Sequence, residues 1–434
     1  MGLQNSGGKD NSIPNQPFAI HRFLRPSYQR IILCCGLLLL CSDHPPLEAE
    51  DRKILLAHYM PWYSSQNISE KWGWHWTMNH FDPKSDTQRK RRQIASHYYP
   101  LIGPYDSNDP HALECQVLLM KFAGIDGVII DWYGITDHND YATLHRNTNH
   151  LIAYIKKAGL RFAICYEDQS IKHMIEGGTL RENQAVAHGV ELLSWMQENW
   201  FGTDAYMKVK GRPLLLVFGP QYFNTAQWEQ LFSALTVRPY FYVLNSFING
   251  ADGIFGWPPV HGGMEIYPAV WRQYLNDFYA WEEDGRHLIG TVFPKFHDIY
   301  AQAGVHQSYG YLDDQDGEVF AETLKIAWAS KTQLIQLITW NDYGEGTIIE
   351  PTLEFGYRYL ETIQHYRQKQ SDPVFPYSAE DLRLPVMLYK LRKRETADNA
   401  LATILDRVSA FMFSSNNESA RELLLNARNP VKNQ

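Results

Sequence analysis

The chain has 434 residues, of which 44% are hydrophobic and 20% are charged, and its formal net charge is −8 at pH 7. This composition is typical of a globular protein with a large buried core, so it excludes a disordered or fibrous chain. The one compact basic run in the body of the chain covers residues 89–92. Nucleic-acid binding needs a wider basic stripe, and we expect no nucleic-acid partner.

Residues 1–50 are predicted to form a signal-like or disordered leader. A cationic stretch at 22–30 precedes an apolar run of 11 residues at 31–41. A bilayer span needs about 20 apolar residues, so this run matches the hydrophobic part of a secretory signal better than a transmembrane helix. We expect a secreted or periplasmic protein, with membrane anchoring as the alternative if the leader is not cleaved.

From residue 51 onward, short apolar runs alternate with longer amphipathic stretches, which is typical of βα units. Strands are predicted at 54–59, 127–132, 161–166, 213–218, 240–244, 253–257, 288–293 and 333–340. Helices are predicted between them at 111–123, 149–157, 182–199, 264–281 and 319–330. Near-continuous apolar runs suit parallel strands that are buried on both faces.

The number of predicted strands favours an α/β fold of the (β/α)8 TIM barrel class, with long loops, over residues 51–372. A doubly wound sheet is less favoured because no Gly-rich dinucleotide loop follows an early strand. Residues 373–434 predict a C-terminal helical extension, with helices at 396–413 and 418–426. Cys115 and Cys165 lie in apolar patterns and are predicted to be buried thiols. We expect a monomer.

In such a barrel the active site lies at the C-terminal ends of the strands, so polar and aromatic residues that end apolar runs are candidates. Aromatic residues make up 14% of the chain, and one loop-like run at 71–76 holds three tryptophans. Aromatic rings pack against the apolar faces of sugars. The candidates for substrate contacts are His58, Tyr59, Trp62, Asp131, Trp132, Tyr133, Tyr166, Glu167, Trp257, Trp340, Asn341 and Glu350. For any single aromatic ring, a place in the hydrophobic core is as well supported as a sugar contact. Glu350 either binds a sugar hydroxyl or fixes its loop.

Two carboxylates, Asp342 and Glu345, follow the eighth predicted strand. Gly344 and Gly346 flank Glu345 and permit a tight turn that directs it toward the pocket. Cleavage of a glycosidic bond needs one acid to protonate the leaving oxygen and a second carboxylate to promote attack. The two residues are therefore the catalytic candidates. No calcium loop, zinc-spaced His pair, phosphate loop or Gly-x-Ser-x-Gly motif occurs, so neither a metal nor another cofactor is expected.

The segment WNDYGEGTIIEP at 340–351 resembles the catalytic strand of glycoside hydrolase families 71 and 99. Stretches at 59–63, 98–105 and 124–134 agree, so the resemblance extends from residue 54 to about 370. It implies that Glu345 is the general acid/base and that Asp342 is the partner base.

The two families differ in what they imply for Asp342. In family 99 the partner is a glutamate, and it deprotonates the 2-hydroxyl of the sugar, which reacts through a 1,2-anhydro sugar with retention. Asp342 is one methylene shorter, which is closer to family 71, where inversion by an activated water is expected. Both stereochemical outcomes stay open at this point.

We therefore predict a glycoside hydrolase that resembles an endo-α-mannosidase or an α-1,3-glucanase and cleaves an α-linked oligosaccharide or polysaccharide, either α-mannan or α-glucan. One alternative is a catalytically inactive carbohydrate-binding barrel, since fold alone does not determine function. The other alternative is a glycosyltransferase associated with polysaccharide synthesis.

Overall fold

The computed structural model describes residues 52–85, 91–371, 375–394 and 399–428, which all belong to one compact unit, Glu50–Gln434. The predicted leader at 1–50 and the predicted domain boundary at 373 lie outside the described residues. Within the described part of the chain, no helix is both long and apolar enough to cross a membrane.

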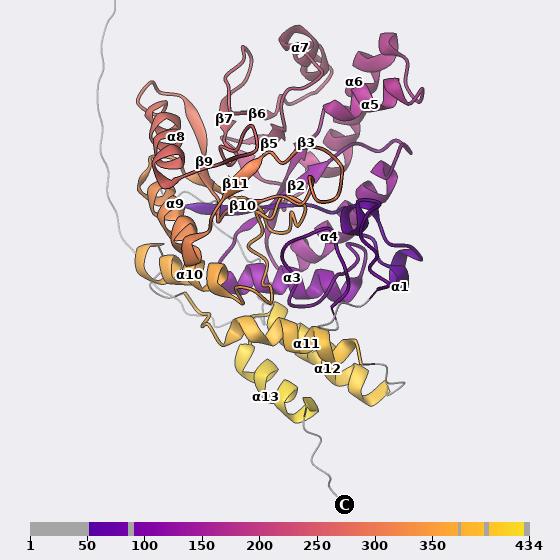
Figure 1. Ribbon diagram of the computed structural model, residues 1–434, viewed down its shortest axis with the longest axis vertical. Helices are drawn as coiled ribbons and strands as arrows, with labels where there is room; N and C mark the ends of the chain where they lie inside the picture. Colours follow the sequence, from indigo (N-terminus) through magenta and orange to yellow (C-terminus); the bar gives the residue numbers. More distant parts are fainter. Residues whose placement is uncertain (1–51, 86–90, 372–374, 395–398, 429–434) are drawn as a thin grey trace, which may run out of the picture. The chain divides into compact units, whose positions relative to one another are not determined.

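The central feature of the fold is a closed barrel of eight parallel strands (Figure 1). Its strands are β1 Ile54–Tyr59, β2 Gly127–Trp132, β3 Arg161–Tyr166, β5 Arg212–Val217, β6 Tyr240–Leu244, β7 Gly253–Phe255, β9 His287–Val292 and β12 Leu334–Leu337. Each strand pairs with the next, and the pairing of Ile54 with Leu334 joins β1 to β12 and closes the ring. The predicted barrel is confirmed. The eighth strand is shorter than predicted, because the chain leaves the regular ladder after Leu337.

Side chains of each strand point alternately into and out of the barrel, as the two-residue period of a strand requires. Leu56, Ile129 and Ala163 belong to the apolar cluster that fills the barrel. Their neighbours Leu55 and Val128 belong to the larger cluster between strands and helices. This alternation decides which strand-end residues reach the interior and the mouth of the barrel.

Helices cover the outside of the barrel (Figure 1). The longer ones are α3 Pro110–Ala123, α4 Tyr141–Lys157, α6 Ala185–Met196, α7 Thr225–Ser233, α8 Pro268–Ala280, α9 Glu318–Ala329 and α10 Arg358–Tyr366. In α3, Asp109 accepts a hydrogen bond from the backbone of His111 and Gly124 ends the helix at φ 84°. Asp109 is thus a standard cap at the start of the helix, and Gly124 is a standard cap at its end.

The helix predicted at 264–281 starts later than expected. Pro268 occupies the first turn of α8, where its missing N–H costs nothing. The preceding segment instead forms the short strand β8 Met264–Glu265, which joins β10 Phe296–His297 and β11 Gly310–Leu312 in a small sheet. The remaining short elements are α1 Gln66–Ser69, α2 Trp74–Thr77, α5 Gln169–Glu176 and β4 Lys208–Val209.

The chain ends in the helices α11 Leu384–Arg392, α12 Asn399–Phe413 and α13 Asn417–Arg428. The prediction contained α12 and α13 but not α11. A buried ion pair of 2.7 Å joins Arg392 on α11 to Glu114 on α3, and the Ser409 hydroxyl on α12 donates to the same carboxylate at 2.6 Å. The C-terminal helices are thus anchored to the outer helix layer and lie apart from the carboxylate-bearing loop after β12.

Candidate active site

Four carboxylates interact electrostatically at the C-terminal ends of the barrel strands. Asp131 ends β2, Glu167 follows β3, and Asp342 and Glu345 follow β12. Burial, followed by the negative charge of Asp342, raises the pKa of Asp131 to about 8. Burial, followed by the charges of Asp131, Asp168 and Glu345, raises the pKa of Glu167 well above its usual value. The barrel therefore brings together carboxylates from three separate parts of the sequence.

The turn that holds Asp342 and Glu345 is tightly bonded. The Asp342 Oδ1 atom accepts a hydrogen bond from the Glu345 backbone at 3.0 Å, and the Asp342 N–H donates to the Thr339 hydroxyl at 2.8 Å. Gly346 has φ 70°, and a Cβ there would lie 2.5 Å from the His297 carbonyl oxygen. Glycine is therefore required at Gly346, as the sequence predicted, whereas Gly344 has no positive φ.

Asp342 and Glu345 differ in proton affinity. Burial, and then the charge of Asp342, raises the pKa of Glu345 well above its usual range. Burial raises the pKa of Asp342 to about 6, against the opposing effect of two backbone N–H groups. Burial and the charge of Asp342 thus favour the protonated form of Glu345, whereas the two backbone N–H groups favour the ionised form of Asp342. Two carboxyl groups with separated pKa values can act as an acid and a base.

Trp257 contacts the predicted acid directly. Its indole Nε1 donates to Glu345 Oε2 at 3.1 Å, and this bond lowers the Glu345 pKa by favouring the charged form. We expect Trp257→Phe to raise that pKa further, because the replacement cannot donate. The alkaline limb of the kcat/KM profile then moves to higher pH. Trp228→Phe is the control, since the Trp228 N–H has no partner, and an alkaline limb that stays in place in Trp257→Phe would contradict the assignment.

Glu350 lies beneath the catalytic turn and has all its hydrogen bonds within the protein. Its carboxylate accepts from Gln116 at 2.7 Å, from Tyr343 at 2.8 Å and from Tyr105 at 3.0 Å. Asn341 joins the same network by donating to Tyr105 at 3.0 Å and bonding the Met60 backbone. Of the two roles considered for Glu350, the geometry supports fixing of the loop. Asn341 is buried like Glu350, and its side chain also bonds within this network.

We expect Glu350→Ala to lower the free energy of unfolding by about 3 kcal/mol or more, because it leaves three buried donors without an acceptor. Denaturant unfolding followed by circular dichroism measures this loss. Glu354→Ala serves as a comparison, since Glu354 is a carboxylate from the same loop that is not fully buried. Equal stabilities of the two variants would show that the buried network does not fix the turn.

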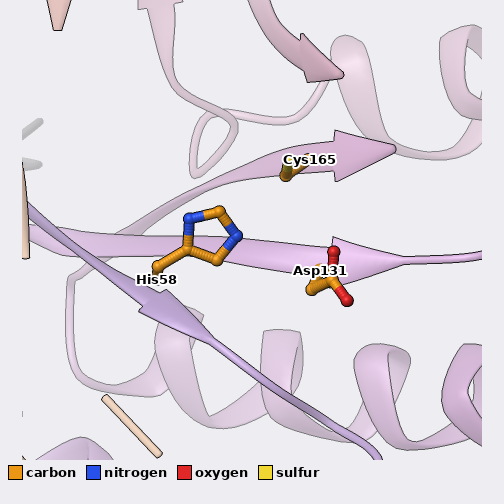
Figure 2. Close-up of side chains that lie close together, drawn as sticks. All are labelled: His58, Asp131 and Cys165. Atoms are coloured by element: carbon orange, nitrogen blue, oxygen red, sulfur yellow. The ribbon is translucent and has the colours of Figure 1, made fainter. Parts of the chain in front are cut away.

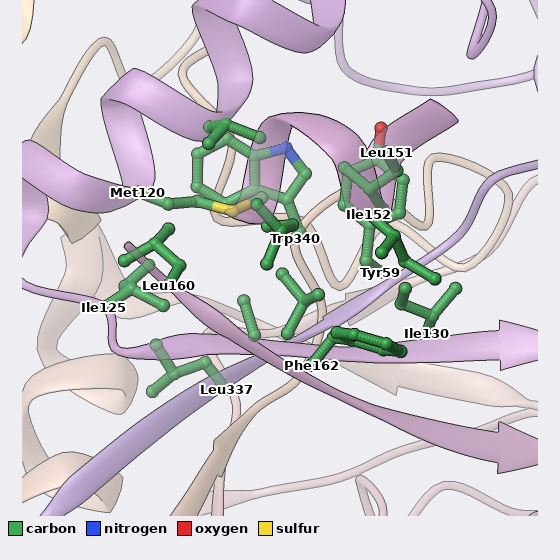
Figure 3. Close-up of a cluster of buried hydrophobic side chains, with 14 of the residues drawn as sticks. Tyr59, Met120, Ile125, Ile130, Leu151, Ile152, Leu160, Phe162, Leu337 and Trp340 are labelled. Carbon is green, nitrogen blue, oxygen red and sulfur yellow. The ribbon is translucent and has the colours of Figure 1, made fainter. Parts of the chain in front are cut away.

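Four of the predicted substrate contacts need correction. Tyr59, Trp132, Tyr166 and Trp340 are buried in the apolar cluster between strands and helices, as Figure 3 shows for Tyr59 and Trp340. For the three residues in strands the physical reason is alternation, since the residue next to an inward side chain points outward, whereas Trp340 lies beyond the end of β12. Tyr59 accordingly donates to Gln116 on α3 at 2.7 Å. These rings stabilise the fold and do not line the pocket.

A pocket of about 730 Å³ opens beside Glu167. Trp62, Tyr133 and Glu167 line it, as the sequence predicted for substrate contacts. The Trp62 ring stacks on the His75 ring at 4.2 Å and 6°. The prediction did not include the other ring-bearing lining residues, which are Trp72, Trp74, His75, Tyr141 and His173. The aromatic run at 71–76 contains three of these residues and was the available signal.

His58 and Trp257 occupy a different place, close to the carboxylates. The His58 and Trp257 rings meet edge to face at 5.1 Å, and both side chains are buried. Burial lowers the pKa of His58 to about 4, so the ring is neutral. Of the predicted residues, the structure thus places His58, Asp131, Glu167, Trp257, Asp342 and Glu345 at or near the carboxylate cluster.

Comparisons with known proteins agree with this geometry. Residues 51–373 match the family model described as glycosyl hydrolase family 99. A glycoprotein endo-alpha-1,2-mannosidase-like protein of Danio rerio is 32% identical over 342 residues, which cover 67% of this chain and 69% of that protein. The glycoprotein endo-alpha-1,2-mannosidase of Mus musculus is 22% identical over 384 residues, covering 78% of this chain and 79% of the mouse protein.

The solved structures show the same fold. The GH99 endo-alpha-mannosidase from Bacteroides thetaiotaomicron superposes with a TM-score of 0.54 at 18% identity, covering 73% of this chain and 96% of that one. Of the two families that the sequence resembles, the matched model is that of family 99. The chain therefore belongs to glycosyl hydrolase family 99 and is a glycoside hydrolase.

Proposed function

We propose that this enzyme is an endo-acting hydrolase of α-mannosidic linkages, with Glu345 as general acid/base and Asp342 as partner base. The observation that carries the proposal is the shared turn after β12, which places the two carboxylates three residues apart and bonds Asp342 Oδ1 to the Glu345 backbone at 3.0 Å. The relatives named as endo-α-mannosidases support the choice of mannose over glucose.

The proposed reaction has two displacements. Glu345 gives its proton to the departing glycosidic oxygen, while Asp342 takes the proton of the 2-hydroxyl, whose oxygen forms a bond to the anomeric carbon. The product of this step is a 1,2-anhydro sugar. The Glu345 carboxylate then removes a proton from water, whose oxygen bonds to the anomeric carbon. Asp342 returns its proton to the 2-oxygen as the anhydro ring opens, so both carboxyl groups regain their starting states. Two inversions give net retention, and the route follows the family resemblance of the catalytic segment.

The aromatic pocket beside Glu167 is the proposed site for further sugars of the chain being cleaved. Trp62, Trp74 and Tyr133 offer rings for the apolar sugar faces, and Glu167 and Asp140 offer acceptors for hydroxyl groups. A pocket that takes several sugars on one side of the cleavage point favours endo action. The product is then an oligosaccharide rather than a single mannose.

The test uses purified enzyme with α-1,2-linked manno-oligosaccharides and with α-1,3-glucan. We expect reducing ends and released oligosaccharides from the mannan substrates and little release from the glucan. Release from α-1,3-glucan alone would overturn the choice of substrate. Glycan binding without any release would favour the inactive binding barrel, and a requirement for a sugar nucleotide would favour a transferase.

We also propose that the enzyme is exported and acts as a monomer. Export rests on the cationic stretch and apolar run at 22–41, which lie outside the described residues. Cell fractionation locates the protein, and light scattering determines its mass in solution.

A further inference from the structure

Three side chains with metal-binding atoms meet inside the barrel. His58, Asp131 and Cys165 lie on the adjacent strands β1, β2 and β3 (Figure 2), and the pairing of these strands places Asp131 directly beside Cys165. One ligand atom from each residue lies within 4.8 Å of the other two. All three side chains are buried. No local sequence pattern predicts this cluster, because its members come from three different strands.

The polar atoms of this cluster lack partners. Neither ring nitrogen of His58 has a partner in good hydrogen-bond geometry, although the Gln336 side chain lies near enough to favour the charged ring, and Asp131 Oδ1 has no partner either. The exposed fractions of the two residues are 0% and 2%. A buried polar group without a partner destabilises the fold, so each one calls for an explanation. Here the unpaired atoms belong to neighbouring strands, which indicates a bound species that satisfies them together.

The charge around the cluster indicates that this species is a cation. Asp131 interacts with Asp342, and Glu167 interacts with both Asp131 and Glu345. Among the described residues, no Lys or Arg forms an ion pair with any of these four carboxylates. A divalent cation bound by the Asp131 carboxylate would supply the positive charge that no described Lys or Arg provides there, and a bound cation is often the largest local charge in a site.

We propose that His58, Asp131 and Cys165 bind a divalent ion of the zinc class. Imidazole nitrogen, carboxylate oxygen and thiolate sulfur are the ligands that zinc uses, whereas calcium and magnesium prefer oxygen ligands alone. Three protein ligands leave the fourth tetrahedral position free, as in catalytic zinc sites. Binding releases the Cys165 proton to solvent, because zinc coordinates the thiolate. This inference stands apart from the roles proposed for Glu345 and Asp342.

The geometry is close to what zinc requires. With bonds of about 2.0–2.3 Å, ligand atoms in a tetrahedral site lie within about 4 Å of each other. The ligand atoms of the three side chains lie within 4.8 Å of one another, so small side-chain rotations would bring them to the distances of a zinc site. Asp131 belongs both to this cluster and to the four interacting carboxylates, so a bound ion would lie next to the candidate active site.

The test measures zinc content in the full chain, purified without a polyhistidine tag, loaded with zinc and dialysed. We expect about one zinc per chain in the wild type and less than about a tenth of that in Cys165→Ser and His58→Ala. Cys115→Ser is the matched control, because Cys115 is also a buried free cysteine within the described part of the chain and lies on α3. It should retain its zinc.

Cobalt(II) gives a second readout that does not depend on activity. We expect a thiolate-to-cobalt charge-transfer absorption in the wild type and in Cys115→Ser, and its loss in Cys165→Ser. Circular dichroism identifies the variants that fold. If Cys165→Ser or His58→Ala does not fold, Asp131→Asn takes its place, because the amide keeps the shape of the side chain. Absence of zinc and of this absorption in the wild type, or their persistence in folded Cys165→Ser, would overturn the proposal.

Discussion

Glu345→Gln is expected to lower kcat on α-1,2-linked manno-oligosaccharides by about 10²–10⁴-fold, the usual contribution of a general acid. The amide has nearly the same shape as the protonated carboxyl group but cannot release a proton. The surroundings favour the protonated form of Glu345, because burial and the charge of Asp342 raise its pKa. The fold should persist, since the substitution removes a titratable group without removing volume. Steady-state kinetics measures the loss.

An α-mannosyl fluoride tests the reason for that loss. Fluoride leaves without needing a proton, so the variant should recover a much larger share of the wild-type rate of bond cleavage on this substrate. Glu265→Gln, which changes an exposed glutamate on β8, is the control and should keep the wild-type rate. An equal loss on both substrates would assign Glu345 to a role other than protonation of the leaving group.

Asp342→Asn is expected to lower kcat by a similar factor of about 10²–10⁴, because the 2-hydroxyl then has no base to accept its proton. Here the fluoride should not restore the rate, since the missing base is needed whatever group departs. Kinetics on both substrates distinguishes the two variants. A folded Asp342→Asn with near-full activity would exclude Asp342 as the base.

The pH profile gives Asp342 a further signature. Its folded-state pKa of about 6 is above the ordinary value, so the carboxylate is ionised above pH 6 and protonated below it. Wild-type kcat/KM should therefore fall as the pH drops through about 6, where the base is lost. The residual activity of Asp342→Asn should lack this acid limb.

The sequence predicted the barrel because strands buried on both faces are continuous apolar runs. It predicted the catalytic turn because Asp342 and Glu345 follow such a run directly. It failed at Tyr59, Trp132, Tyr166 and Trp340, which lie beside the barrel mouth but point into the outer core. The two-residue period places His58 and Tyr59 on opposite faces of their strand, but it does not say which face points into the barrel. That choice depends on the neighbouring strands.

Residues that act through long-range contacts were the hardest to predict. The role of Glu350 depends on Gln116 and Tyr105, which are far from it in the sequence. The pocket residues Trp72 and His75 lie in a loop whose course no local pattern determines. The short helix α11 was missed in the Pro-containing stretch after residue 373, where Pro385 occupies its first turn.

The most direct test of the proposed chemistry is the anomeric form of the first product, followed by proton NMR from the moment the enzyme is added to an α-1,2-linked manno-oligosaccharide. Two displacements through a 1,2-anhydro sugar predict that the α-anomer forms first and the β-anomer appears only later by mutarotation. Initial formation of the β-anomer would contradict this route, and so would the absence of any new reducing end.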